Sequence, residues 1–241
     1  MKRLFVFLAI LLCLCSCSLF QEQQIHLVAV GIADYPGTRN DLRLPAKDAR
    51  AIVSIYEANS NANTVLLTNA EATRSKIITT MKNVYGNAAR KDIVVFFFSG
   101  HGYDQGGFVA YDDKLTYDDI REVFSSSRSK HKMIFADACF SGKIRTDSQN
   151  VRKKPLGADV MLFLSSRSDE VSFERPGMKN GFYTTCLERC LRGGADADKD
   201  RVITAKELYQ GVSKGVIELS QGKQHPVMWG SFDDEMPVMI W

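Results

Sequence analysis

The stretch Asp92-Ile-Val-Val-Phe-Phe-Phe-Ser-Gly-His101-Gly102 joins an apolar run of strand length to a histidine set among small residues. An uninterrupted apolar run of this length is typical of a strand that is buried on both faces. We therefore predict a strand over Asp92–Phe98. His101 then follows the carboxyl end of that strand, which is the edge where ligands bind in parallel sheets.

A second segment has the same construction. Lys132–Ala136 is predicted to be a buried strand, and it leads into Asp137-Ala-Cys139-Phe-Ser-Gly142. A thiol is a weak nucleophile until a base takes its proton, and the base must come within about 3 Å. Two strand ends of one sheet satisfy that need, so the pattern indicates nucleophilic catalysis by Cys139 with His101 as its base. The alternative is a buried cysteine and a core histidine whose hydrogen bonds are satisfied.

Outward from these two segments, apolar runs of strand length alternate with amphipathic segments of helix length. This alternation predicts a mostly parallel sheet with right-handed crossovers, covered by helices. Further strands are expected over Ile25–Ala33, Thr64–Thr68 and Ala158–Leu164, and helices over Pro45–Ala58, Thr73–Tyr85, Thr116–Ser125, Gly181–Leu191 and Thr204–Leu219.

The frame Ser99-Gly-His-Gly102, followed by Asp-Ala-Cys-x-Ser-Gly with Cys139 38 residues after His101, resembles the caspase-fold peptidases. It is most similar to the metacaspases and bacterial caspase-like proteins, and the mammalian signature Gln-Ala-Cys-x-Gly is not present. The resemblance implies an α/β fold, a caspase-like three-layer α/β/α sandwich with a mostly parallel central sheet. Further stretches resemble the family at Gly31–Gly37, Leu42–Ala49, Asn180–Thr185 and His225–Gly230.

The resemblance also implies a cysteine endopeptidase that acts on proteins or peptides and requires no cofactor for its chemistry. His101 acts as base and then as acid, Cys139 attacks the carbonyl, and the N–H groups of Gly102 and Cys139 form the oxyanion hole. A catalytically inactive binding or scaffold lipoprotein with the same fold is the alternative.

Substrate preference follows from the family's acidic pocket. The matching residues here are Asp48, Ser99 and Asp137, which implies cleavage after Arg or Lys, because paired carboxylates bind a guanidinium well. The alternative is that Asp48 favours the first turn of its helix and Asp137 shapes a turn. The basic loop Lys143–Leu156 is either an autoprocessing segment or a solvated loop.

The first residues have the order of a secretory signal peptide. Lys2 and Arg3 precede an apolar run over Leu4–Leu14, which is too short to span a membrane. Leu14-Cys-Ser-Cys17 resembles the lipobox of bacterial lipoproteins, which implies a lipid on Cys17. We expect residues 1–17 to be leader and lipidation site, 18–24 a short linker and 25–241 one peptidase domain. The protein would be exported and lipid-anchored to the cell envelope, at the outer membrane or periplasmic face; an ordinary cysteine-rich signal peptide is the alternative.

Charge and cysteine usage argue against a nucleic-acid-binding protein and against a disulfide-stabilised fold. Without Lys2 and Arg3 the chain has 29 basic and 28 acidic residues, a formal net charge of +1, so nothing suggests a nucleic-acid partner. Beyond the leader only Cys139, Cys186 and Cys190 remain, too few for a disulfide framework. Cys186 and Cys190 share one face of a predicted helix and are expected in the core.

One more pattern points to a metal. The run Asp196-Ala-Asp-Lys-Asp-Arg-Val-Ile-Thr-Ala-Lys-Glu207 matches the spacing of the EF-hand calcium loop, except that Arg201 replaces the glycine of position 6. The alternative is a polar loop that ends in a capping box. A protein whose main role is calcium-dependent surface binding is a third functional class. The predicted ligands are Asp196, Asp198, Asp200, Thr204 and Glu207.

Overall fold

A computed structural model describes the chain except for residues 1–21, 60, 104, 140–156, 158 and 167–176. Its centre is a sheet in the order β2-β1-β3-β6-β7-β9, in which β9 is antiparallel to β7 and the other neighbours are parallel. The strands of this path are β1 (Ile25–Gly31), β2 (Ala62–Thr68), β3 (Ile93–Tyr103), β6 (His131–Cys139), β7 (Val160–Leu164) and β9 (Val227–Ser231).

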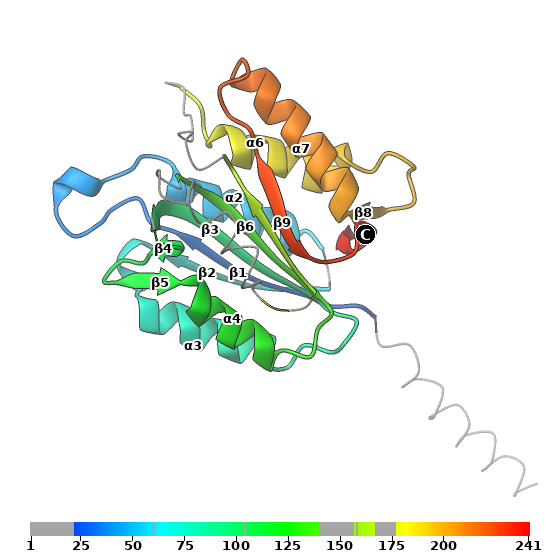
Figure 1. The fold of residues 1–241 in the computed structure, drawn as a ribbon, viewed down its shortest axis with the longest axis horizontal. Helices are drawn as coiled ribbons and strands as arrows, with labels where there is room; N and C mark the ends of the chain where they lie inside the picture. Colours follow the sequence, from blue (N-terminus) through cyan, green and yellow to red (C-terminus); the bar gives the residue numbers. More distant parts are fainter. Residues whose placement is uncertain (1–21, 60, 104, 140–156, 158, 167–176) are drawn as a thin grey trace, which may run out of the picture.

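Helices cover both faces of the sheet, which gives the expected three layers (Figure 1). On one face lie α2 (Pro45–Glu57), α6 (Phe182–Arg189) and α7 (Ala205–Leu219); on the other lie α3 (Arg74–Tyr85) and α4 (Tyr117–Ser126). Successive strand residues alternate between the two cores, because side chains of a strand point to opposite faces. The fold class predicted from the alternating pattern is therefore confirmed.

The helix starts follow local chemistry. Thr116 caps α4 in a capping box with Asp119, and Thr204 caps α7 in the same way with Glu207. Pro45 opens α2, where its missing N–H has no intrahelical partner to lose. These local contacts fix the residue at which each of the three helices begins.

Two strands are longer than predicted, and this changes where the residues of the predicted dyad lie. β3 continues to Tyr103 and β6 to Cys139, so His101 and Cys139 lie inside strands and not after their ends. Pairing explains the difference, because β3 bonds to β6 on one side and to the short β4 (Gly107–Val109) beyond His101. Neither extension follows from the apolar run alone.

The remaining elements are short and were not predicted as separate elements. They are η1 (Thr38–Asn40), η2 (Asn69–Glu71), β5 (Lys114–Thr116), the π-helical turn η3 (Cys190–Gly194), β8 (Val202–Thr204) and β10 (Pro237–Ile240). β8 and β10 form a separate two-stranded sheet beside α7. In the described part of the chain, no helix has the length and apolar character needed to cross a bilayer.

Candidate active site

The site is organised by the register of two neighbouring strands. Parallel pairing of β3 with β6 aligns Ser99 with Asp137 and His101 with Cys139. Neighbouring strands lie about 4.8 Å apart, so the backbones of these partners are as close as a sheet permits. The structure describes the backbone of Cys139, whereas its side chain lies outside the described atoms. The fold thus brings together the two backbone positions that the predicted dyad requires.

The imidazole of His101 is held by a residue of η1. Its Nε2 lies 2.8 Å from the carbonyl oxygen of Asn40. A carbonyl oxygen only accepts, so Nε2 carries a proton and the neutral ring presents Nδ1 as its basic nitrogen. Asn40 therefore fixes both the orientation and the tautomer of a side chain that is expected to move protons.

Tyr35 contacts the backbone and the ring of the same histidine. Its hydroxyl accepts a hydrogen bond from the His101 N–H at 3.0 Å and donates one to the Val109 carbonyl at 3.1 Å. The rings of Tyr35 and His101 lie 4.8 Å apart, centroid to centroid. Burial raises the pKa of Tyr35 to about 12, against a smaller lowering by the His101 N–H, so the hydroxyl keeps its proton and both bonds.

Gly100 makes room for this contact. Its φ is +154°, and a Cβ at this position would lie 2.7 Å from the Tyr35 hydroxyl. The Ser-Gly-His-Gly frame is therefore partly a packing requirement of Tyr35. Sequence reasoning missed both Tyr35 and Asn40 as site residues. The nearest signal was the stretch Gly31–Gly37, which resembles the family's opening strand and turn and contains Tyr35.

The three residues predicted to bind the substrate side chain are buried together at the start of α6. Ser99 donates to Asp48 at 2.9 Å, and Asp48 also accepts from the N–H of Gly181 at 3.2 Å. Asp137 accepts from the hydroxyl and the N–H of Thr184, at 2.9 and 3.3 Å. Two carboxylates thus meet the N-terminus of one helix, where its N–H groups and dipole favour negative charge.

These contacts also give Asp48 and Asp137 a structural role. Asp48 does more than occupy the first turn of α2, because it links β3 to α6. Asp137 binds the first turn of α6, and a Cβ on Gly181 would lie 2.7 Å from its Oδ2. The Asn180-Gly-Phe-Tyr stretch therefore needs glycine at 181 so that the helix can reach the carboxylate.

Comparison with known proteins identifies the family. The family model for the caspase domain, Peptidase C14, matches residues 26–236. The chain belongs to the caspase-domain family. Among solved structures, this domain is similar to protein GSU0716 from Geobacter sulfurreducens, with a TM-score of 0.66 and 17% identity over 90% of this chain and 97% of that one. At that identity the similarity concerns the fold alone. No curated protein gives a significant match.

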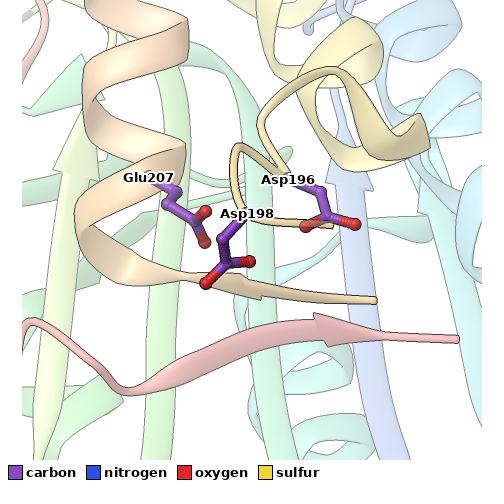
Figure 2. Close-up of side chains that lie close together, drawn as sticks. All are labelled: Asp196, Asp198 and Glu207. Atoms are coloured by element: carbon purple, nitrogen blue, oxygen red, sulfur yellow. The ribbon is translucent and has the colours of Figure 1, made fainter. Parts of the chain in front are cut away.

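The predicted calcium ligands of the caspase domain are only partly brought together. Oxygens of Asp196, Asp198 and Glu207 lie within 4.8 Å of one another (Figure 2). The carboxylate of Asp200 instead accepts from the N–H of Val202, and the Thr204 hydroxyl bonds Glu207 in the capping box. Burial raises the pKa of Glu207, but hydrogen bonds from Thr204 and Ala197 outweigh it and lower the pKa below its ordinary value.

Cys186 and Cys190 are buried and unbonded to each other, as predicted. Burial raises the pKa of the Cys186 thiol to about 11, so it is a packing residue of α6. A groove of about 490 Å³ runs beside α2 and the start of α6, lined by Lys47, Ala51, Ser54, Met178, Lys179, Asn180 and Glu188, and includes none of the predicted site residues. Cys17 and the loop Lys143–Leu156 lie outside the described residues.

Proposed function

We propose that this caspase domain is a cysteine endopeptidase with Cys139 as nucleophile and His101 as its base. Membership of a peptidase family supports the reaction class. The observation that carries the residue assignment is the register of β3 and β6, which pairs His101 with Cys139. The Asn40 carbonyl adds to it, because it leaves Nδ1 of His101 as the nitrogen that accepts a proton.

In this proposal the Cys139 sulfur forms a bond to the scissile carbonyl carbon while His101 takes the thiol proton. The N–H groups of Gly102 and Cys139 receive the charge that develops on the carbonyl oxygen. The carbon–nitrogen bond then breaks, and His101 returns the proton to the departing amine. Water hydrolyses the remaining thioester, with His101 as base once more, and frees the thiol.

We further propose that the enzyme cleaves after Arg or Lys. Support comes from the acidic group formed by Asp48, Ser99 and Asp137, since Ser99 and Asp137 precede His101 and Cys139 by two residues on their strands. A guanidinium or ammonium placed there meets carboxylates at close range in a buried setting, where charge-assisted hydrogen bonds are strong. A substrate with an acidic side chain would be repelled.

The deciding experiment compares fluorogenic peptides that differ only in Arg, Lys or Asp before the cleaved bond, using wild type and Cys139→Ala. Cleavage after Arg or Lys that disappears in Cys139→Ala is the expected result. Cleavage after Asp would retain the peptidase and overturn the pocket. If folded protein cleaves nothing and Cys139 does not react with a peptide chloromethyl ketone, the domain is a binding or scaffold protein.

The N-terminal stretch supports a second proposal, that the protein is exported and anchored through a lipid on Cys17. Its support is the charged start, the short apolar run and the Leu-Cys-Ser-Cys sequence. In cells fed an alkyne-labelled fatty acid, wild type should incorporate the label and partition into the detergent phase, whereas Cys17→Ala should do neither. Equal labelling of both would reject Cys17 as the lipidated residue.

A further inference from the structure

A group of three carboxylates between η3 and α7 lacks the charge that would balance it. Asp196, Asp198 and Glu207 bring one oxygen each to within 4.8 Å of the others (Figure 2). None of the ion pairs formed by the described residues includes any of the three. Like charges at such separations repel one another. The group therefore has an electrostatic cost that no described Lys or Arg ion pair offsets.

An independent observation concerns one atom of Asp196. Its Oδ2 accepts a hydrogen bond from the N–H of Arg201 at 3.2 Å. Its Oδ1 has less than 1 Å² of exposed surface and no hydrogen-bond partner among the described residues. A carboxylate oxygen that is shielded from water and has no donor is costly, so native structures normally supply a donor or a cation. The other members of the group, Asp198 and Glu207, are carboxylates and offer this oxygen no donor, so a cation would supply the missing partner.

From these two observations we infer that Asp196, Asp198 and Glu207 bind one calcium ion. All three offer oxygen, the ligand that hard cations require. Calcium accepts six to eight oxygens in flexible geometry, whereas magnesium demands a near-ideal octahedron. An irregular loop with three carboxylates, one of them at the twelfth position where a bidentate Glu is usual, therefore favours calcium.

Such an ion would join two parts of the caspase domain. Asp196 and Asp198 follow the end of η3, whereas Glu207 lies in the first turn of α7. The N–H of Ala197 already donates to Glu207 at 3.0 Å, so the two sides of the site touch. A ligand that binds only the folded state stabilises it by mass action. Calcium should therefore raise the melting temperature, whether or not the domain is a peptidase.

The test uses the full-length protein in detergent, freed of divalent ions with a chelator. Calcium and magnesium chloride are titrated by calorimetry, and the melting temperature is followed in parallel. Glu207→Gln is the main variant, since glutamine also completes a capping box and only the charge is lost. Glu218→Gln is the matched control, because it makes the same change on the last turn of α7, away from the loop.

Wild type should bind one calcium ion per chain, and Glu207→Gln should bind it roughly 10- to 100-fold more weakly, because loop affinity depends on ligand charge. Glu218→Gln should match wild type. Asp198→Asn, on an exposed position, serves as a second variant and decides the matter if Glu207→Gln does not fold. The inference is overturned if folded wild type shows neither heat nor stabilisation at millimolar calcium. It is also overturned if both folded variants bind like wild type.

Discussion

His101 and Cys139 occupy the same register position on adjacent parallel strands, β3 and β6. The pairing places two backbones side by side whose positions in the chain are separated by a helix, a hairpin and a turn. His101 is then oriented by residues of the loop that follows β1, through the Asn40 carbonyl and the Tyr35 hydroxyl. The candidate site therefore depends on three chain segments, β3, β6 and the loop that follows β1.

Tyr35→Phe should lower activity by releasing the backbone of His101. The variant loses the bond from the His101 N–H and the bond to Val109. We expect kcat to fall roughly 10- to 100-fold with KM unchanged, because small misplacements of a catalytic group are costly. Tyr85→Phe is the control, since it also loses a buried tyrosine hydrogen bond, to Val95, but none to His101. Both variants should lose about 1 kcal/mol of stability; equal kcat values in the two would remove Tyr35 from the site.

Asp48→Asn should weaken cleavage after Arg or Lys while the nucleophile stays reactive. The two oxygens of Asp48 accept separately from the Ser99 hydroxyl and the Gly181 N–H. The amide of asparagine keeps one oxygen for the Gly181 N–H and turns its NH2 to the Ser99 hydroxyl, which can accept, while the charge that a guanidinium needs is lost. A hydrogen bond to a charged group contributes about 1.5–3 kcal/mol, so kcat/KM should fall roughly 10- to 100-fold. Glu57→Gln, on the exposed last turn of α2, is the matched control. Alkylation of Cys139 by iodoacetamide should proceed at the wild-type rate; unchanged peptide cleavage would show that Asp48 only supports the fold.

The three cysteines beyond the leader should differ sharply in reactivity. Burial raises the pKa of Cys186 to about 11 and also raises the pKa of Cys190, so both remain thiols at pH 8. Iodoacetamide at that pH should label Cys139 in the folded protein and reach the other two only after unfolding in urea. Peptide mass mapping identifies which of the three cysteines carry the label. Labelling of Cys186 ahead of Cys139 in folded protein would contradict the assignment of the nucleophile.

Arg201→Gly should stabilise the protein, because Arg201 has a left-handed φ of 72°. That conformation costs a non-glycine residue about 1–2 kcal/mol, and glycine adopts it freely. The urea midpoint should rise by the equivalent of about 1 kcal/mol with an unchanged slope. Arg201→Ala removes the same charge without relieving the backbone, so it should not gain stability. A rise in both variants would assign the effect to charge.

Much of the candidate site was predictable from local sequence. The apolar runs that lead to Ser99 and Asp137 identify buried strands, although β3 and β6 continue past the predicted ends to Tyr103 and Cys139. Thr116 with Asp119 and Thr204 with Glu207 have capping-box spacing, and both boxes form. Position 6 of the loop Asp196–Glu207 demands a left-handed residue, and Arg201 adopts that conformation although it is not glycine. These features depend on neighbours within a few residues, so the sequence alone determines them.

Tertiary structure alone decided how the segments meet. The extension of β3 to Tyr103 depends on pairing with β4 and β6. The alignment of His101 with Cys139 depends on the register in which β6 pairs with β3. Asn40 and Tyr35 reach His101 only because the loop after β1 folds back over β3. Gly181 and Thr184, at the start of α6, donate hydrogen bonds to Asp48 and Asp137, and each pair is separated by more than forty positions in the chain. Such contacts are set by the packing of whole elements, because a single residue of slip in a strand reverses the face of every side chain.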